Sequence, residues 1–394
     1  MARHEIKIIL KAGKQEIVKR GHPWVFSGAI SRVLGSGQAG DMALLCDHTE
    51  KPLAKGFYHP HSDIAFRLLC RDPAIEINRD FWHSRIQRAI ALRKRILPLD
   101  TNAYRLINAD GDYLPGLIVD RYADTLVLSI SVFGMERQRE LIYELLQQTL
   151  QPNHIYERSE GKSRLREGLA ERCAWLTEPR TERLVIRENN LLFHVDALKG
   201  QKTGFFLDQR ENRQMVCSLS PGLRVLNAFS YSGGFSVYAI QGGAQSVTSV
   251  EISPSANSLA KENLNLNHMA VDRHPLLTED VFTYLRRPDQ LFDLIILDPP
   301  AFAKTQKEVQ QACRGYKDIN LNAAKKLVQD GLLMTFSCSN HLDESLFQKV
   351  VLSAVSDAGR SAQVLKVLGP GADHPFQLAH PEGRYLKGLL LRLD

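Results

Sequence analysis

Short apolar runs separated by Gly and Pro dominate the chain up to about residue 72. Runs such as "DMALLCD" and "DIAFRLLC" are β-prone and too short for helices, so they predict a small β domain. Beyond them Trp82, Ile86 and Ile90 recur at four-residue spacing, as one face of an amphipathic helix over 80–97 requires. Two strand-like runs and a helical pattern over 136–150 follow. We therefore expect a small central α+β domain.

The pattern changes again after a predicted hairpin at "RLVIRENNLLFHVD", whose Asn189-Asn190 pair suits a tight turn. From about residue 200, apolar runs alternate with helical patterns such as "SANSLAKENLNLN", which is typical of a parallel sheet with helices on both faces. The predicted strands are "RVLNAF", "SVTSVEI", "LFDLIILD", "LLMTFSCS" and "YLKGLLLRL". Ligands bind such sheets at the carboxyl ends of the strands, so we look for chemistry there.

Length and composition agree with several folded domains. The 394 residues exceed one ordinary hydrophobic core, and we place domains at 1–72, 73–190 and 191–394. No apolar run is long enough for a membrane span or a signal peptide, which predicts a cytoplasmic protein. The six cysteines form no C-x-x-C pair, which argues against both a disulfide framework and a zinc site, so no metal is expected.

The net charge of +6 is modest, but basic residues gather near the start of the chain. Lys14, Lys19 and Arg20 precede His22 and Trp24 in "GHPWVFSGAI". Basic side chains neutralise phosphates and aromatic rings stack on bases, so these residues are candidates for RNA binding. The alternative is a solvated basic edge with the aromatic residues in the core.

Polar residues stand at the ends of the first two predicted C-terminal strands. Asn227 closes one strand, and Gly233-Gly234 permits a tight turn into the next helix. The stretch lacks the G-x-G-x-x-G spacing of a dinucleotide site. Glu251 ends the next strand, where a carboxylate can accept hydrogen bonds from both hydroxyls of a ribose. This combination favours a nucleoside cofactor without phosphates, although Glu251 could also serve only a helix N-terminus.

A third strand delivers Asp298 to the same edge, where Pro299-Pro300 ends the strand pairing. With this stretch, "NAFSYSGGF" and "TEDVF", the chain resembles class I S-adenosylmethionine-dependent methyltransferases. The motifs "HPWVFSGAI", "KTGFFLDQREN", "ACRGYKDIN", "TFSCS" and "ADHPFQLAHPEGRYLKG" extend the resemblance to the ribosomal RNA large-subunit methyltransferase I family over nearly the whole chain. One departure is Ala301, where relatives commonly have Lys.

The resemblance implies a PUA RNA-binding domain, a central linking domain and a Rossmann-like methyltransferase domain. It also implies S-adenosylmethionine as cofactor and 5-methylcytosine formation in 23S rRNA of the large ribosomal subunit. The cofactor-binding residues that it implies are Asp208, Arg210, Asn227, Phe229, Tyr231, Gly233, Glu251, Asp280 and Asp298.

Carbon 5 of cytosine is a weak nucleophile, so such enzymes first add a thiolate to carbon 6. Cys338, at the end of the strand "LLMTFSCS", is the candidate nucleophile, and Cys313 is its rival. We expect the start of the following helix to help ionise the Cys338 thiol. Asp298 is a candidate for hydrogen bonding to the protonated base, whereas the group that removes the carbon-5 proton is unidentified.

Other functions remain open at this point. Asp298-Pro299-Pro300 with Phe302 is similar to the grip that amine and guanine methyltransferases place on exocyclic nitrogens, which would need no thiol. A non-catalytic RNA-binding assembly factor would need only the basic N-terminal part. The sequence leaves open whether the protein is a monomer or a homodimer.

Overall fold

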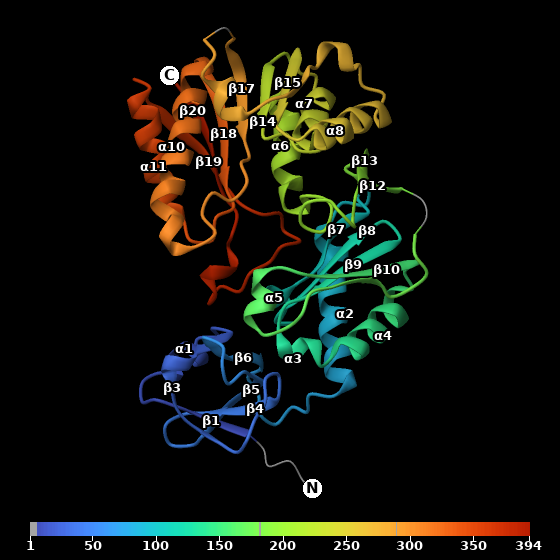
Figure 1. Cartoon of the computed structure of the whole chain (residues 1–394), viewed down its shortest axis with the longest axis vertical. Helices are drawn as coiled ribbons and strands as arrows, with labels where there is room; N and C mark the ends of the chain where they lie inside the picture. Colours follow the sequence, from blue (N-terminus) through green and yellow to red (C-terminus); the bar gives the residue numbers. More distant parts are fainter. Residues whose placement is uncertain (1–5, 181–182, 289) are drawn as a thin grey trace. The chain divides into compact units, whose positions relative to one another are not determined.

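The computed structural model describes residues 6–180, 183–288 and 290–394. These residues belong to two compact units, which we describe separately (Figure 1). The N-terminal unit comprises the chain up to Leu184 together with Asp196–Phe205 and Ala372–Gly383. The C-terminal unit comprises Val185–Val195, Phe206–Gly371 and Arg384–Asp394. Among the described residues, no helix is both long and apolar enough to cross a bilayer.

The N-terminal unit begins with a six-stranded sheet in the order β2-β6-β5-β4-β1-β3. Pairing is antiparallel except between β1 and β4. Its core is formed by apolar side chains such as Ile8, Leu45 and Phe66, each fully buried. The elements are β1 (Ile6–Leu10), α1 (Gln15–Lys19), β2 (Trp24–Phe26), β3 (Ile30–Leu34), β4 (Met42–Cys46), β5 (Pro52–Tyr58) and β6 (Ile64–Cys70).

The same unit holds a five-stranded sheet in the order β11-β10-β9-β8-β7, covered by the predicted long helix α2 (Arg79–Ile96). The helix begins where the Asn78 side chain accepts a hydrogen bond from the Phe81 amide, and it buries Trp82, Ile86 and Ile90 as the spacing predicts. The other elements are β7 (Ala103–Asn108), β8 (Leu117–Tyr122), β9 (Thr125–Ile130), α3 (Phe133–Glu136), α4 (Arg139–Leu150), β10 (His154–Ser159), α5 (Lys162–Arg166) and β11 (Arg172–Trp175).

One basic residue of α2 is buried, although a solvated basic face is the simpler expectation. The Arg93 side chain is 1% exposed, and its two terminal nitrogens donate to the carboxylate of Asp112 at 2.5 and 2.7 Å. A second ion pair joins Arg105 of β7 to Asp120 of β8, and the Asp120 carboxylate is fully buried. Burying these charges is tolerable because each guanidinium meets a carboxylate in two-pronged geometry.

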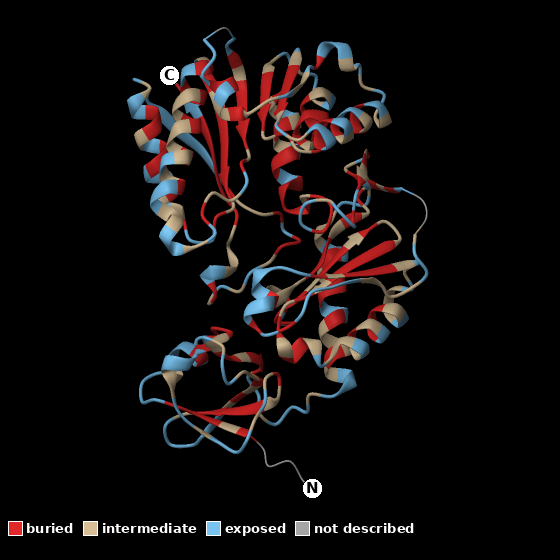
Figure 2. Ribbon diagram, viewed as in Figure 1, coloured by how far each residue is buried: buried red, intermediate tan, exposed pale blue. Residues whose placement is uncertain are grey.

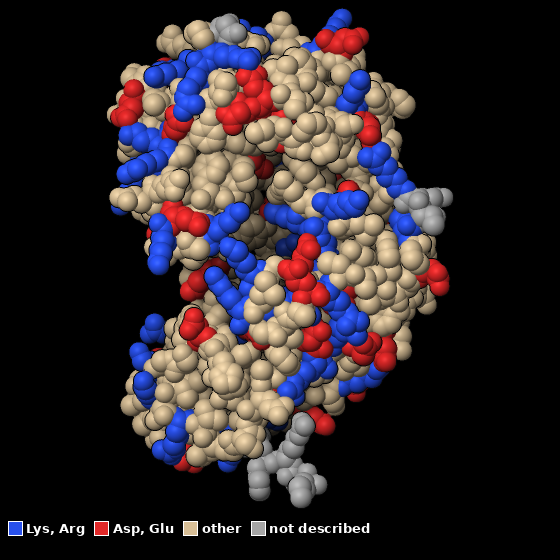
Figure 3. Space-filling view, viewed as in Figure 1, with Lys and Arg blue, Asp and Glu red and all other residues tan. Residues whose placement is uncertain are grey.

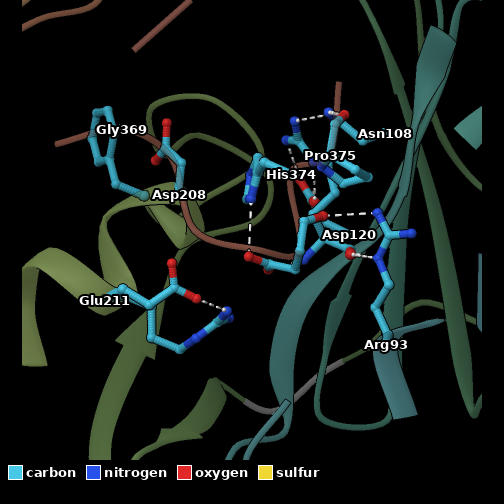
Figure 4. Close-up of polar contacts among 12 residues, drawn as sticks. Arg93, Asn108, Asp120, Asp208, Glu211, Gly369, His374 and Pro375 are labelled. Carbon is cyan, nitrogen blue, oxygen red and sulfur yellow. Dashed lines mark hydrogen bonds and ion pairs between the residues drawn. The ribbon is translucent and has the colours of Figure 1, made fainter. Parts of the chain in front are cut away.

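The segment Ala372–Gly383 comes from near the end of the chain yet belongs to the N-terminal unit. Asp373 accepts a hydrogen bond from the Arg105 amide at 2.9 Å, and its carbonyl accepts from Arg93 at 2.7 Å. Figure 4 shows the neighbouring His374 and Pro375; the carbonyl of Pro375 accepts from the Asn108 amide at 2.8 Å. The segment is therefore fastened to the central sheet by buried polar contacts.

A two-stranded hairpin, β12 (Leu184–Glu188) with β13 (Leu191–Val195), begins the C-terminal unit. The proposed domain boundary at residue 190 differs from this arrangement, because it falls between the two paired strands. Glu188 accepts from Arg213 of α6 (Arg210–Leu219) at 2.8 and 2.7 Å and from the Tyr238 hydroxyl at 3.0 Å. This buried ion pair joins the hairpin to the rest of the unit.

The core of the C-terminal unit is a seven-stranded sheet in the order β16-β15-β14-β17-β18-β20-β19. The first five strands are parallel, whereas β20 is antiparallel to both β18 and β19, so the expected all-parallel sheet is mixed. The strands are β14 (Arg224–Ala228), β15 (Ser246–Glu251), β16 (Leu276–Thr278), β17 (Phe292–Leu297), β18 (Leu327–Ser337), β19 (Ala362–Leu368) and β20 (Lys387–Leu393).

Helices cover both faces of this sheet, as the alternating pattern predicts, and its central strands are buried (Figure 2). One apolar cluster joins the sheet to α9, α10 and α11, and another joins it to α6 and α7. The remaining helices of this unit are α7 (Gly234–Gln241), α8 (Pro254–Leu266), α9 (Val281–Leu285), α10 (Val309–Lys326) and α11 (Glu344–Asp357), with a short 3-10 turn η3 (Leu207–Gln209) before α6.

The buried Arg213–Glu188 pair generates a stability prediction. Arg213→Met leaves the fully buried Glu188 carboxylate without its cation, so the C-terminal unit should lose about 3–5 kcal/mol of stability. Urea unfolding followed by circular dichroism, with hydrogen exchange of the β12–β13 hairpin, measures the loss. The control Arg224→Met breaks a partly exposed pair with Asp293 and should cost no more than about 1 kcal/mol. Equal losses in the two variants would contradict the assigned role of the buried pair.

Candidate active site

The carboxyl ends of four neighbouring parallel strands bring the predicted residues to one edge of the sheet. Asn227 lies in β14, Glu251 ends β15, Asp298 follows β17 and Cys338 follows β18. These strands are consecutive in the order β15-β14-β17-β18, and all run in the same direction. The sheet therefore aligns an amide, two carboxylates and a thiol along a single edge.

The loop after β14 has an unusual backbone. Phe229, Tyr231 and Gly233 have φ angles of 61°, 45° and 77°, in the left-handed region. A Cβ added to Gly233 would lie 3.0 Å from the Cβ of Ala260, so any larger residue would strain both the backbone and the contact with α8. The tight turn keeps main-chain groups of this loop at the strand ends.

Asn227 is buried below this loop. Its side-chain nitrogen donates to Ser236 at 2.8 Å, and Ser236 shares a hydrogen bond of 2.7 Å with Ser249. The geometry fits a structural support for the loop, which holds β14, β15 and α7 together. A direct contact between Asn227 and a cofactor stays a prediction.

Glu251 fixes the loop from the neighbouring strand. Its carboxylate accepts from the Tyr231 amide and from the Ser253 amide, each at 2.9 Å. Each carboxylate oxygen has a second lone pair, so Glu251 can still accept hydrogen bonds from a ligand. The residue is half-buried at the strand end, which fits the expected recognition of a ribose.

Other predicted cofactor residues lie near the starts of helices. Asp280 is the N-cap of α9, where one carboxylate oxygen accepts from the Thr283 amide at 2.9 Å. Asp208 is buried in η3 and accepts from the Tyr385 hydroxyl, while the adjacent Arg210 pairs with Glu211 at 3.1 Å (Figure 4). The structure brings Tyr231 and Glu251 together by a hydrogen bond. The other three predicted residues have different partners: Tyr385 for Asp208, Glu211 for Arg210 and Thr283 for Asp280.

The thiol of Cys338 lies beside the loop that follows β17. Its sulfur is 3.8 Å from the carbonyl oxygen of Pro299, and the residue is half-buried. The contact follows from the parallel pairing of β17 with β18, in which Leu297 stands opposite Thr335. The Cys338 loop therefore lies beside the Asp298-Pro299-Pro300 turn.

Three residues that sequence reasoning missed hold the Cys338 loop in place. Ser339 accepts from the Ala303 amide at 3.2 Å, shares a hydrogen bond of 3.0 Å with the Tyr316 hydroxyl, and receives Lys387 on its carbonyl at 2.8 Å. Burial raises the pKa of Tyr316, so its hydroxyl stays protonated. The signal was present in "ACRGYKDIN" and "RYLKG", but only the folded sheet shows that these motifs meet.

The position of the following helix gives little support to the expected help in ionising the thiol. Helix α11 begins only at Glu344, and its N-cap Asp343 already accepts from the Leu346 amide. Any cationic help for Cys338 must therefore come from elsewhere. The rival thiol, Cys313, packs in α10 against the apolar core, where burial raises its pKa and disfavours the thiolate.

The alternative of amine methylation assigns Phe302 to the grip on an exocyclic nitrogen. Phe302 packs in an aromatic cluster, with its ring centroid 4.6 Å from that of Tyr316 and 5.9 Å from that of Phe282. Phe302 therefore has a packing role in the unit, and a contact with a base is not needed to explain it. Among the described residues, no group of His, Cys, Asp and Glu could hold a metal ion.

The predicted RNA-binding residues divide into two sets. Lys14, Lys19 and Arg20 are exposed, and Figure 3 shows scattered Lys and Arg side chains on the surface of the N-terminal part of the chain. His22 is buried, and Trp24 packs against His380 with ring centroids 4.3 Å apart. Because these two rings have partners inside the unit, the expected RNA contact stays a prediction that rests best on the three basic residues.

Comparisons with known proteins identify the class of this site. Residues 126–368 match the family model of S-adenosylmethionine-dependent methyltransferases, and residues 8–71 match that of PUA-like domains. The fold is also similar to that of a chain assigned as a methyltransferase and solved in complex with SAH, with a TM-score of 0.85 at 24% identity over 98% of this chain and 99% of that one. The chain is a methyltransferase of this class, and S-adenosylmethionine is its cofactor.

Two curated relatives narrow the family. Proteins named ribosomal RNA large subunit methyltransferase I from Aeromonas salmonicida and Tolumonas auensis are each 43% identical over 391 residues, which is 98% of both chains compared. The chain therefore belongs to the ribosomal RNA large subunit methyltransferase I family. This result confirms the resemblance, the PUA-like N-terminal domain, the methyltransferase domain and the cofactor expected from the sequence.

Glu251 provides a test of the cofactor site. Glu251→Ala should weaken S-adenosylmethionine binding by on the order of 1–3 kcal/mol, because a charged acceptor is lost, and Glu251→Gln should lose less. Isothermal titration calorimetry measures the affinity. The matched control Asp357→Ala removes a carboxylate of α11 from an exposed pair with Lys317 of α10 and should leave binding unchanged. An unaltered affinity in Glu251→Ala would reject the assignment.

Proposed function

We propose that this protein transfers a methyl group from S-adenosylmethionine to carbon 5 of a cytosine in 23S rRNA, through a covalent adduct with Cys338. The observation that carries the proposal is the position of the thiol, at the sheet edge shared by Glu251 and Asp298 and 3.8 Å from the Pro299 carbonyl. The relatives' printed names support ribosomal RNA as the substrate. Such a substrate places the protein in the cytoplasm.

In the proposed reaction the Cys338 thiolate forms a covalent bond to the base and is released at the end. The Cys338 thiolate adds to carbon 6, and the electron pair of the carbon 5–carbon 6 bond becomes available at carbon 5. Bound S-adenosylmethionine would supply the methyl group that carbon 5 takes up, and the electron pair of the broken methyl–sulfur bond would stay on the sulfur of S-adenosylhomocysteine. Loss of the carbon-5 proton then expels the thiolate from carbon 6 and restores the aromatic base. The thiol is regenerated unchanged.

The other residues at the edge take binding and positioning roles. Glu251 accepts hydrogen bonds from the cofactor ribose, and the Tyr231–Gly233 turn lets the ligand approach main-chain groups. Asp298 lies next to the proline that the thiol contacts, and its proposed role is to hydrogen-bond the protonated ring of the adduct. Asp208, Arg210 and Asp280 complete the proposed cofactor set.

The nucleophile is tested by trapping. RNA with 5-fluorocytosine at the target should stay attached to the enzyme, because after methyl transfer carbon 5 carries fluorine where a proton must leave. The complex should survive denaturing electrophoresis. Cys338→Ala should lose both the trapped complex and methylation yet bind S-adenosylmethionine normally, whereas the control Cys313→Ala should keep all three.

Two results would contradict this mechanism. Normal methylation by Cys338→Ala would remove the thiol from the reaction and favour methylation of an exocyclic amine at Asp298-Pro299-Pro300. A trapped complex formed only through Cys313 would transfer the role to the other thiol. Mass spectrometry of rRNA nucleosides identifies the methylated atom in either case.

RNA binding through the basic edge of the PUA-like domain has its own test. Replacing Lys14, Lys19 and Arg20 together with Ala should weaken RNA binding and flatten the dependence of log affinity on log salt by roughly 2, if each residue neutralises one phosphate. Filter binding at several salt concentrations measures both effects. A matched triple of exposed lysines in the C-terminal unit, Lys325, Lys349 and Lys366, serves as the control. Equal effects of the two triples would argue against a specific role for the PUA-like domain.

A further inference from the structure

A buried lysine stands beside the proposed nucleophile. Lys387 begins β20, is 4% exposed, and lies directly opposite Ser337 in the pairing of β20 with β18. Ser337 is the residue before Cys338, so the strand register brings the lysine alongside the thiol loop. A buried ammonium costs free energy unless it is paired, and a lysine is retained in such a place only where the charge has a partner.

The Lys387 amine has a hydrogen bond to the main chain and several titratable neighbours. Its nitrogen donates to the Ser339 carbonyl at 2.8 Å. The titratable groups that act on it are Cys338, Asp343, Glu344 and Arg384. Glu344 and Arg384 form an ion pair with each other at 2.6 Å, and Asp343 is engaged as the N-cap of α11. Of these groups, Cys338 in its thiolate form would attract the lysine charge most strongly.

The Cys338 thiol would ionise more readily with a positive charge nearby. In the structure Cys338 points its S–H at the Pro299 carbonyl, and a carbonyl oxygen stabilises the protonated thiol and repels a thiolate. No helix N-terminus lies at Cys338 to offset this effect, because α11 begins at Glu344. A cation on the other side of the loop is what would favour ionisation.

We propose that Lys387 is the positioning residue that holds the Cys338 loop through the Ser339 carbonyl and stabilises the Cys338 thiolate with its ammonium charge. The proposal deepens the cysteine mechanism and rests on it for its significance in methylation. Its physical content, the effect of Lys387 on thiol reactivity, can be measured without RNA.

The pH dependence follows from the burial of Lys387. Desolvation lowers the pKa of Lys387 to about 8, while the Cys338 charge opposes that shift. Below this pH the amine is an ammonium and favours the thiolate; as pH rises through about 8, the charge and its benefit are lost. The benefit is therefore greatest near neutral pH, where an unassisted thiol is mostly protonated.

The test is the rate of Cys338 alkylation by iodoacetamide in the full-length protein, mapped by mass spectrometry as a function of pH. Lys387→Met should react about tenfold more slowly than the parent protein near pH 7, and the two rates should converge above about pH 9. Lys387→Arg keeps a charge that does not titrate, so its rate should exceed that of Lys387→Met wherever the unassisted thiol is still mostly protonated, below about pH 8.5. Lys326→Met is the matched control, since Lys326 is also buried but lies at the opposite end of β18, and it should behave like the parent.

The outcomes separate this proposal from the proposed function. Equal alkylation rates in the parent protein and Lys387→Met, or equal rates in Lys387→Arg and Lys387→Met, would overturn the role of the lysine even if methylation fell. If Lys387→Met does not fold, as judged by circular dichroism and cofactor binding, the comparison of Lys387→Arg with the parent above pH 8 decides: only the arginine variant should keep the benefit. Normal methylation by Cys338→Ala would instead refute the cysteine mechanism and leave the alkylation result standing.

Discussion

The parallel pairing of β15, β14, β17 and β18 is the constraint on which the active site depends. Parallel strands end at the same edge of the sheet. The residues that follow these strands therefore lie close together although they are far apart in the sequence. The register of β17 with β18 is the critical part, because it places the sulfur of Cys338 3.8 Å from the Pro299 carbonyl. A shift of one residue would turn the thiol to the other face of the sheet.

The antiparallel strand β20 adds what a purely parallel sheet would lack. Because β20 runs against β18, its first residue meets the last residues of β18, and Lys387 arrives beside Cys338. A parallel strand at this place would bring its last residue there. The mixed sheet thus brings a buried lysine to the edge that carries the proposed nucleophile, and Tyr316 and Ser339 contact the loop there.

Much of this arrangement could be predicted from the sequence. Strongly periodic segments, such as the α2 region and the apolar strands β14, β17 and β18, were recognisable because burial dictates their pattern. The three-residue β16 is too short to carry a period, and the edge strand β19 is exposed on both faces, so neither gave a signal. The direction of β20 depends on the path of the segment between β19 and β20. The sequence of that segment has no periodic pattern, so the direction could not be predicted. The candidate Glu251 could be named because it ends a strand, and Cys338 because the resemblance implies a reaction that needs a thiol. The positions of Lys387 and Arg93 depend on partners from distant segments, Ser339 and Asp112.

The route of the chain also explains why domain boundaries drawn as consecutive ranges differ from the structure. Ala372–Gly383 interrupts the C-terminal unit between β19 and β20, yet Asp373 in this segment is fully buried against Arg93 and Arg105 of the N-terminal unit. A fragment that began at residue 191 would carry this carboxylate without its partners and would lack β12, which pairs with β13 and holds the Glu188 end of the buried ion pair with Arg213. Removing one side of buried polar contacts is costly, because the remaining groups lose both water and partner.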